Sequence, residues 1–225
     1  MKTLAVGDIH TKTWIIDRVE KLIDKYDAIV FCGDYADDWH KDALDSIETW
    51  NRLYLLHQAH PDKVKLVLGN HDFIYVRKTP SLQRGYNTIT QLAINSPANN
   101  YLRQWLLGLP ITLEVDGVTF SHAGIAKGWD GTQEMSDLWQ DQSPIWARPQ
   151  YSEYLQVPQV FGHTPQRTCT ELHPNIWAID TFSTYSDGTP IGDHTVLEIK
   201  NGKTFKKIKL NENTNNTTRK SREVS

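Results

Sequence analysis

The sequence predicts an α/β fold in which a mixed β core is flanked by helices. Short apolar segments of the kind found in buried strands alternate with helical patterns over the first third of the 225 residues. A strand–helix–strand–helix–strand order predicts a parallel sheet joined by right-handed crossovers. Further short strand patterns continue through the second half of the chain, and they extend the predicted β core.

The elements of the first third follow from the spacing of their apolar residues. Strands are expected at residues 2–6, 27–32 and 64–68, and helices at residues 14–26 and 43–57. The first helix is amphipathic, because Trp14, Ile15, Val19, Leu22 and Ile23 fall on one helical face. Pro61 marks the end of the second helix before the third strand begins.

The second half is predicted to contain more strands. A helix is expected at residues 99–107, followed by strands at residues 111–115, 118–121, 160–161, 176–179, 195–199 and 203–210. The dipeptide Asp116-Gly117 predicts a hairpin turn between the first two of these strands. Residues 124–154 show little periodicity but contain three tryptophans, which indicates an ordered capping segment. Apolar content collapses after residue 210, so we expect one domain over residues 1–210 and a disordered tail over 211–225.

Composition and charge exclude several classes of protein. Lys and Arg total 24 against 27 Asp and Glu, and this formal charge of −3 offers no basic field for nucleic acid or for an anionic membrane surface. Two cysteines, Cys32 and Cys169, are too few for a disulfide framework and favour a reducing, cytoplasmic setting. Residues 1–6 are too short for the apolar core of a signal peptide, and no stretch approaches the roughly 18 apolar residues of a membrane span.

Polar side chains follow each of the three strands predicted in the first third. Asp8 and His10 follow the first strand, Asp34 the second, and Asn70 and His71 the third. The carboxyl ends of parallel strands converge on one crevice, and the glycine before each cluster permits a tight turn and a close backbone approach. We therefore expect these side chains to meet at one point.

Two further histidines, His122 and His163, follow later predicted strands in the same way. Together with Asp8, Asp34, Asn70 and His10 they form a mixed oxygen and nitrogen donor set. Such a set suits Mn, Fe or Zn better than Ca. One shared carboxylate can hold two cations about 3.5–4 Å apart, which is the geometry of a two-metal hydrolytic site. Each motif alone is more often a simple turn or a hydrogen-bonded histidine, so the prediction depends on their number and order.

The motifs occur in the order GDIH (7–10), GDYADD (33–38), GNHD (69–72), SHAG (121–124) and FGHTP (161–165). This series resembles the calcineurin-like metallophosphoesterases. It is more similar to the phosphoprotein phosphatases of phage and bacterial type, such as the enzyme of bacteriophage lambda. Residues 145–148 (IWAR) and 178–181 (AIDT) also look like that type, and the resemblance covers about residues 1–210. It implies a β-sandwich flanked by helices.

The resemblance also implies roles for particular residues. Asp8, His10 and Asp34 would hold one metal ion, and Asp34, Asn70, His122 and His163 would hold the second, with Asp34 bridging. His71 matches the catalytic histidine of the family and Asp37 its carboxylate partner, an arrangement that gives a usable acid near neutral pH. Arg148 and Asn70 would bind the substrate phosphate, although a structural salt bridge is the alternative for Arg148.

The implied reaction is hydrolysis of a phosphoester by a water that two divalent metal ions activate, with Mn expected and Fe or Zn possible. A phosphomonoesterase of the serine/threonine protein phosphatase type is the first interpretation. A phosphodiesterase or dinucleoside polyphosphate hydrolase is the alternative. A further alternative is a scaffold that keeps the fold without catalysis, although all six ligand positions and His71 are present. The expected partner is a phosphoester in a phosphoprotein, a small molecule or a nucleotide.

The chain departs from the family pattern beside this site. The second motif of the family normally ends Asp-Arg-Gly, and that arginine also binds phosphate, whereas here Asp37 is followed by Asp38 and Trp39. We expect Asp38 to repel a phosphate dianion unless its side chain points away, which favours diesters. Smaller departures are Thr11, Ala123 and Phe182. The changes leave the metal-ligand positions intact and affect the choice of substrate.

Overall fold

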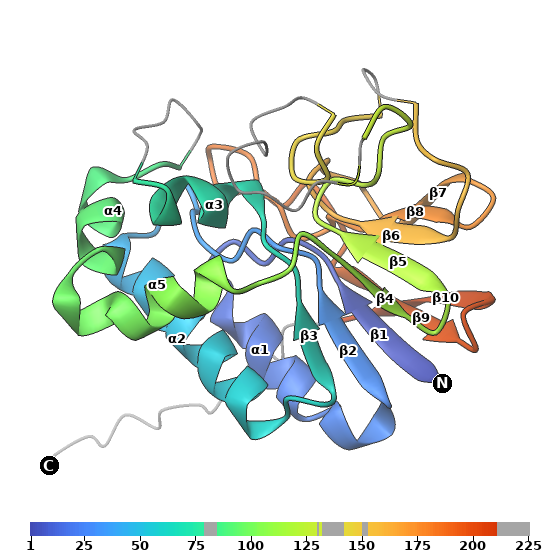
Figure 1. The fold of residues 1–225 in the computed structure, drawn as a ribbon, viewed down its shortest axis with the longest axis horizontal. Coiled ribbons are helices and arrows are strands. Elements are labelled where there is room, and N and C mark those ends of the chain that lie inside the picture. Colours follow the sequence, from blue (N-terminus) through green and yellow to red (C-terminus); the bar gives the residue numbers. More distant parts are fainter. Residues whose placement is uncertain (79–84, 130, 132–141, 150–152, 211–225) are drawn as a thin grey trace, which may run out of the picture.

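The computed structural model describes residues 1–78, 85–129, 131, 142–149 and 153–210 (Figure 1). Over these residues, two sheets of five strands each pack against one another, and helices cover the outer face of the first sheet. The predicted α/β sandwich with flanking helices is therefore confirmed. The tail predicted beyond residue 210 lies outside the described residues. Within the described part of the chain, none of the helices has the length and apolar composition needed to cross a membrane.

The first sheet combines three parallel strands with two antiparallel ones. β1 (Lys2–Val6), β2 (Ala28–Phe31) and β3 (Val64–Leu66) run parallel, with Leu4 opposite Ile29 and Ile29 opposite Val64. β9 (Thr195–Lys200) pairs antiparallel with β1, and β10 (Thr204–Lys209) pairs antiparallel with β9. The order β10-β9-β1-β2-β3 brings the carboxyl ends of three neighbouring strands to one edge of the sheet.

The second sheet has the order β4-β5-β6-β8-β7. β4 (Thr112–Val115) and β5 (Val118–Ser121) form the predicted hairpin, in which both Asp116 and Gly117 have positive φ, as the favoured two-residue turn requires. β6 (Gln159–Phe161) and β8 (Ile176–Ala178) continue in parallel from β5, and β7 (Thr170–His173) is an antiparallel edge strand. The strands β5 and β6 end at the same side of the molecule as β1, β2 and β3 (Figure 1).

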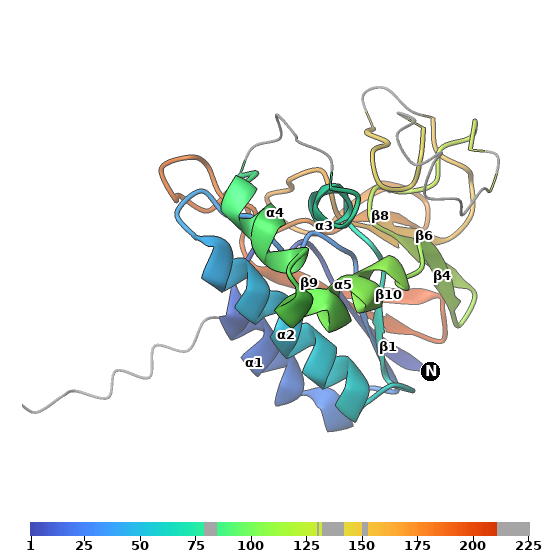
Figure 2. The same ribbon diagram turned by 60° about the vertical axis from the view of Figure 1, so that its left-hand side comes forward.

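The helices lie on the outer face of the first sheet (Figure 2). They are α1 (Thr13–Glu20), the 3₁₀ turn η1 (Ile23–Lys25), α2 (Ala43–Ala59), α3 (Asn70–Val76), α4 (Thr88–Ile94), the 3₁₀ turn η2 (Pro97–Asn99) and α5 (Asn100–Leu107). The longest helix, α2, begins with a capping box, in which Asp42 accepts from the backbone N–H of Asp45 and the Asp45 carboxylate accepts from the N–H of Asp42.

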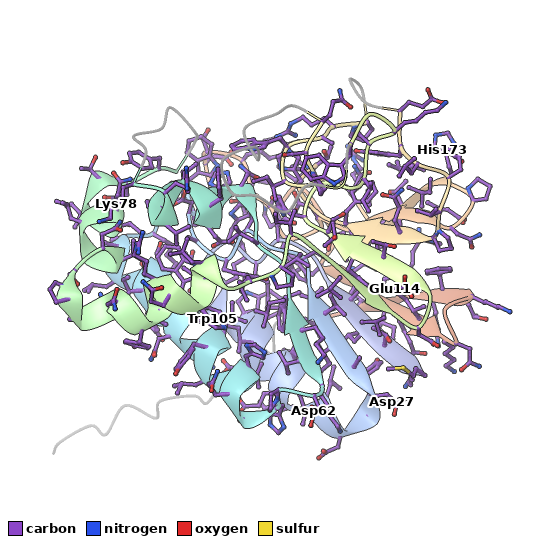
Figure 3. All side chains as sticks on the ribbon, viewed as in Figure 1. Asp27, Asp62, Lys78, Trp105, Glu114 and His173 are labelled. Carbon is purple, nitrogen blue, oxygen red and sulfur yellow. The ribbon has the colours of Figure 1, made fainter. Side chains whose placement is uncertain are left out.

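Buried apolar side chains form three layers (Figure 3). The largest lies between the helices and the first sheet, with Trp50 of α2 fully buried in it. The second lies between the two sheets, where Val30 of β2 and Phe120 of β5 belong to one cluster. The third covers the outer face of the second sheet, where Ala126 and Tyr154 pack on Phe161. Ala126 and Tyr154 belong to the segment 124–154 that was predicted to cap the sheet. Residues 130, 132–141 and 150–152 of that segment lie outside the described residues.

Some elements differ from the prediction. The helix expected at residues 14–26 is divided into α1 and η1, and both parts keep the apolar face toward the core. Helix α3 was not predicted because six of its seven residues are buried, so it has no amphipathic pattern. Helix α4 begins with Thr88, Ile89 and Thr90, whose β-branched side chains lower helix propensity. Strand β7 is a short, half-exposed edge strand with a weak apolar pattern.

Candidate metal centre

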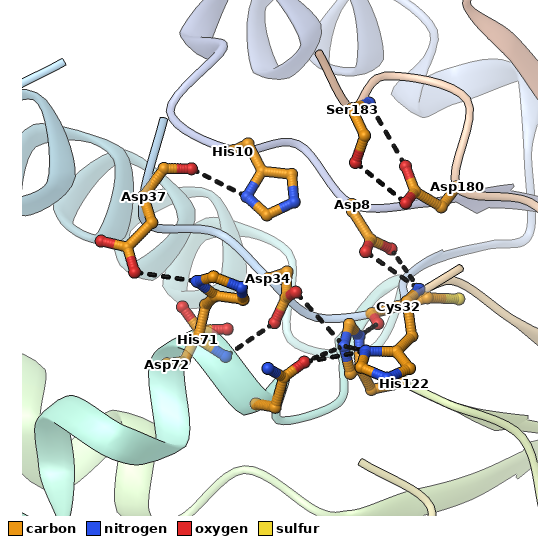
Figure 4. A network of polar contacts seen from close by, with 12 residues as sticks. Asp8, His10, Cys32, Asp34, Asp37, His71, Asp72, His122, Asp180 and Ser183 are labelled. Atoms are coloured by element: carbon orange, nitrogen blue, oxygen red, sulfur yellow. Dashed lines mark hydrogen bonds and ion pairs between the residues drawn. The ribbon is translucent and has the colours of Figure 1, made fainter. Parts of the chain in front are cut away.

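Loops from both sheets converge at the edge where the parallel strands end (Figure 4). The structure brings together all of the predicted ligand positions, which are Asp8 and His10 after β1, Asp34 after β2, Asn70 after β3, His122 after β5 and His163 after β6. They form two donor groups that share Asp34: Asp8, His10 and Asp34 in one, and Asp34, His122 and His163 in the other, which Asn70 joins. The expected convergence is therefore observed. Asn70 and His71 stand in the first turn of α3, however, and not in a loop.

Glycines permit the close approach of these loops. A Cβ on Gly69 would lie 2.1 Å from the backbone nitrogen of Asp34, and a Cβ on Gly162 would lie 1.8 Å from Oδ1 of Asp8. Three of the ligand positions also have left-handed backbone: His10 (φ 40°), Asp34 (φ 52°) and His163 (φ 64°). Each such conformation costs about 1–3 kcal/mol in a residue other than glycine, and such strain clusters at functional sites. The left-handed backbone at these three positions turns their side chains toward the donor groups.

The donor group shared by Asn70, His122, His163 and Asp34 is tightly packed. Nε2 of His122 lies 2.7 Å from Oδ1 of Asn70 and 3.3 Å from Oδ2 of Asp34. Nδ1 of His163 lies 3.1 Å from His122 Nε2 and 2.9 Å from Asn70 Oδ1. The Nδ1–H of His122 donates to the carbonyl of Cys32 at 2.8 Å, so Nε2 faces the other donors.

This arrangement fits a divalent cation. Oδ2 of Asp34, Oδ1 of Asn70 and Nε2 of His122 are all electron-pair donors, and a cation between them would relieve their mutual repulsion. Burial, followed by the neighbouring His122 and Arg148, lowers the pKa of His163 well below its ordinary value, and neutral imidazole is the form that binds metal. The group therefore offers two nitrogen and two oxygen ligands.

The second donor group consists of Asp8, His10 and Asp34. The Nδ1–H of His10 is held by two backbone carbonyls, Ala36 at 3.0 Å and Asp37 at 2.8 Å, which leaves Nε2 as the atom available to a metal. Burial raises the pKa of Asp8 well above its ordinary value, and the carboxylates of Asp180 and Asp34 raise it further. A cation bound at this position would offset the mutual repulsion of the carboxylates of Asp8, Asp34 and Asp180.

The centre carries an excess of buried carboxylates. They are Asp8, Asp34, Asp37, Asp72 and Asp180. Asp180 accepts hydrogen bonds from Oγ of Ser183 at 2.9 Å and from its backbone N–H at 3.2 Å, and burial raises its pKa to about 6. Its side chain was not predicted to belong to the site, although it follows β8 as the ligands follow their strands. Two divalent cations match this concentration of negative charge.

His71 and Asp37 form a pair beside the two donor groups. Nδ1 of His71 lies 2.8 Å from Oδ2 of Asp37, and the His71 ring meets the His10 ring edge-on at 5.4 Å (Figure 4). Burial lowers the pKa of His71, but the carboxylates of Asp34 and Asp37 outweigh burial and raise it to about 9. His71 belongs to neither donor group. The pair can hold and deliver a proton next to a metal site without ligating the metal.

Asp72 holds the two central loops together. Its carboxylate accepts the backbone N–H groups of Tyr35 at 3.2 Å and Ala36 at 3.3 Å and the indole N–H of Trp50 at 2.8 Å. Because Tyr35 and Ala36 lie between Asp34 and Asp37, these bonds fix both carboxylates relative to α3. The sequence placed Asp72 in a polar cluster without indicating this role.

The structure places Asp38 at the cleft and gives its carboxylate a cationic partner. Oδ2 of Asp38 forms a salt bridge with Nζ of Lys12 at 2.8 Å, and Oδ1 accepts from the backbone N–H of His40 at 3.1 Å. Burial raises the pKa of Asp38, but Lys12 outweighs burial and holds it below the usual value. Lys12 precedes α1 and was not predicted to belong to the site. Asp38 lies beside the site with its charge largely neutralised.

A cleft of about 360 Å³ opens over the donor groups and the His71–Asp37 pair. Its walls include Trp39, Arg148, Pro165, Thr184 and Ile191, and Asp38 also reaches it. Among the described residues, no carboxylate forms a salt bridge with Arg148. A cationic side chain at the wall of a cleft over a metal centre suits an anionic ligand.

Known proteins share the sequence pattern and the fold. A family model for calcineurin-like phosphoesterases matches residues 1–175. A symmetrical bis(5'-nucleosyl)-tetraphosphatase of Janthinobacterium sp. (strain Marseille) is 25% identical over 169 residues, which cover 73% of this chain and 58% of that protein. The chain thus matches less than two thirds of the length of that curated relative.

Solved structures with the same fold include two phosphatases. A cold-active protein-tyrosine phosphatase of a psychrophilic Shewanella species has a TM-score of 0.63 at 20% identity, over 92% of this chain and 80% of that one. A protein serine/threonine phosphatase of Saccharomyces cerevisiae has a TM-score of 0.62 at 15% identity, over 96% and 82% of the two chains. With the family match over residues 1–175, the chain belongs to the calcineurin-like phosphoesterases.

Proposed function

We propose that the chain is a metal-dependent phosphomonoesterase of the serine/threonine protein phosphatase type. The observation that carries the proposal is the His71–Asp37 pair, which lies beside two donor groups that share Asp34. Asp8, His10 and Asp34 would hold one divalent cation, and Asp34, Asn70, His122 and His163 would hold the other. Mn is the metal we expect, and Fe or Zn also suits this mixed donor set.

The residues of the cleft would then have distinct tasks. When bound, the two cations supply a water of lowered pKa and positive charge near the phosphoryl oxygens. His71, whose Nδ1 is held by Asp37, would deliver a proton from Nε2 to the leaving oxygen. Arg148 and Asn70 would contact the phosphate, and the planar guanidinium of Arg148 suits two of its oxygens.

Two features of the cleft support a monoester over a diester. A phosphomonoester carries the larger negative charge, so it depends more on the cationic wall that Arg148 provides. The Asp38 carboxylate, which would repel this charge, is paired with Lys12 at 2.8 Å. This ion pair weakens the repulsion that Asp38 would exert on a phosphate dianion, and it supports the monoester proposal.

Substrate comparison tests the proposal directly. With Mn²⁺ added, the chain is expected to hydrolyse p-nitrophenyl phosphate faster than bis-p-nitrophenyl phosphate, and to release phosphate from a phosphoserine peptide. Chelation of metal should abolish both activities, and renewed Mn²⁺ should restore them. Faster cleavage of the diester would contradict the monoester assignment, and full activity after chelation would contradict the metal-dependent mechanism.

Removal of the Lys12 charge gives a sharper test of substrate charge. Lys12→Met leaves the Asp38 carboxylate unpaired beside the cleft, so KM for p-nitrophenyl phosphate should rise several-fold and KM for the diester much less. Unit charges at about 4 Å near a protein surface interact by roughly 4 kcal/mol before screening, and about 1.4 kcal/mol corresponds to a tenfold change in binding. The double variant Lys12→Met/Asp38→Asn is the control and should recover most of the loss. Equal KM changes for both esters would show that Asp38 does not face the substrate.

A dinucleoside polyphosphate hydrolase is the second candidate. The curated relative bears the name of such an enzyme. The cleft also contains Trp39, which is 39% exposed and whose indole N–H donates to the carbonyl of Thr184 at 3.2 Å. An aromatic ring held at the wall of a phosphate-binding cleft can stack on a nucleobase. Faster turnover of a symmetrical dinucleoside tetraphosphate than of p-nitrophenyl phosphate would favour this candidate.

We also propose a reducing, cytoplasmic setting for the chain. Support comes from Cys32 and Cys169, which are both buried and outside any disulfide. Burial raises the pKa of both thiols, so neither has the low pKa of a reactive cysteine. Fractionation of cells that produce the chain would test the compartment.

A further inference from the structure

The helix that carries His71 also carries a tyrosine that reaches the same carboxylate. Tyr75 lies one helical turn after His71 in α3, so the two side chains share a face of the helix. The hydroxyl of Tyr75 donates a hydrogen bond to Oδ1 of Asp37, while Oδ2 of Asp37 lies 2.8 Å from Nδ1 of His71. Both oxygens of the Asp37 carboxylate are therefore occupied by side chains from a single helix.

Tyr75 is itself held in one position. Its ring is fully buried, stacks on the ring of Tyr86 at 5.4 Å and 15°, and meets Trp50 edge-on at 5.6 Å. Its oxygen accepts the backbone N–H of Asn87 at 2.9 Å. With that acceptor site filled, the hydroxyl proton is directed to Asp37.

Asp37 is held in place by its backbone surroundings as well as by Tyr75. It has a φ of 64°, in the left-handed region. Gly85 packs against its other side, where an added Cβ would lie 2.9 Å from the Cβ of Asp37. Asp37 is thus enclosed by Gly85, Tyr75 and His71, and Gly85 and Asn87 connect Tyr75 and Asp37 to the same segment of chain. The sequence motifs did not indicate the hydrogen bond between Tyr75 and Asp37, because Tyr75 lies outside all of the motifs.

We propose that Tyr75 is a positioning residue, the third member of a Tyr75–Asp37–His71 relay that orients the His71 ring for proton delivery to the leaving oxygen. This inference rests on the proposed function. The phenol fixes the orientation of the Asp37 carboxylate, and the carboxylate in turn fixes Nδ1–H of His71 and the plane of its ring. Nε2 of His71 is then aimed at the cleft, which His71 lines.

The test is Tyr75→Phe, which removes the hydroxyl and keeps the ring. In the Mn²⁺-loaded chain, kcat for phenyl phosphate should fall about tenfold, the scale of one hydrogen bond to a charged group, with KM within about twofold of the parent. For 2,4-dinitrophenyl phosphate, whose leaving group needs no proton, kcat should change little. Bound Mn²⁺, measured by elemental analysis, should stay the same. A merely structural role would lower both rates equally.

Tyr26→Phe is the matched control. Tyr26 is also buried and also donates to a carboxylate, Glu198 Oε2 at 3.0 Å, but neither Tyr26 nor Glu198 lines the cleft. Tyr26→Phe should leave kcat unchanged for both phenyl phosphate and 2,4-dinitrophenyl phosphate. In an Asp37→Asn background, Tyr75→Phe should have no further effect, because the relay is already broken.

Several outcomes would overturn the inference. One is an equal loss of kcat for phenyl phosphate and 2,4-dinitrophenyl phosphate, and another is an equal loss in the Tyr26→Phe control. A change in KM alone, or additive losses of kcat in the Asp37→Asn/Tyr75→Phe double variant, would also contradict the relay. So would a Tyr75→Phe chain that circular dichroism shows to be unfolded at 25 °C. If the parent chain has no phosphatase activity, or His71→Asn keeps full turnover, the proposed function fails. If His71→Asn loses turnover and Tyr75→Phe does not, the positioning role alone fails.

Discussion

Asp34→Asn is expected to remove most of the bound metal and to lower phosphatase turnover by more than about 100-fold, the upper end of the losses seen for residues that only support metal ligands. Asp34 is the one residue common to both donor groups. Burial raises its pKa, but His122 and His71 outweigh burial and keep the pKa below its ordinary value, so the side chain is an anion. Asparagine keeps the shape of the side chain and removes the charge that both cations need.

Metal content and kcat/KM should be measured on the same preparation. Asp62→Asn is the matched control, because Asp62 is exposed at the opposite end of the first sheet (Figure 3). It should change neither quantity. An Asp34→Asn chain that keeps two metal ions and full turnover would contradict the assignment of Asp34 as the shared ligand.

The convergence of the six candidate ligand positions could be predicted from the sequence because local signals mark them. Each follows a short apolar strand, and the turns at Gly33, Gly69 and Gly162 carry glycines that the close loop packing requires. The parallel order of β1, β2 and β3 then follows from the strand–helix alternation. Convergence on one edge is a consequence of topology, so motifs far apart in the chain could be assigned to a single site.

The residues that support the site could not be predicted in the same way. Asp72 contacts Trp50 and the loop after β2, Lys12 pairs with Asp38, and Tyr75 reaches Asp37, and none of these contacts has a local pattern. The contacts of Asp72 and Tyr75 depend on the position of α3, which has no amphipathic face because six of its seven residues are buried. The partner of Asp38 was hidden for a similar reason: its charge was visible in the sequence, whereas Lys12 lies 26 positions away.

Asp180 is another residue near the site that could not be assigned from the sequence. Asp180 and Ser183 form a pair in the loop after β8, and Asp180 contributes to the negative charge around Asp8. The signal for Asp180 was present, since it follows a predicted strand as Asp8 follows β1. It lacked the glycine and the histidine that made the other clusters recognisable, so composition alone did not separate it from an ordinary turn.

His71→Asn is expected to keep the bound metal and to lower kcat by about 10²–10⁴, the range associated with general acid–base catalysis. The His71 imidazole belongs to neither donor group, and the contact of His71 with Asp34 runs through its backbone N–H at 2.9 Å. Asparagine preserves that backbone contact and removes the ring that would deliver the proton. The loss should be largest for phenyl phosphate and small for 2,4-dinitrophenyl phosphate.

His173→Asn is the matched control, since His173 is exposed at the end of the edge strand β7, far from the cleft (Figure 3). It should leave kcat and metal content unchanged. Loss of metal together with activity in His71→Asn would instead make His71 a ligand. Retained metal with an equal loss for both aryl phosphates would leave His71 a role in binding the phosphate and none in proton delivery. Only the combination of retained metal and a loss that grows with the basicity of the leaving oxygen assigns the proton to His71.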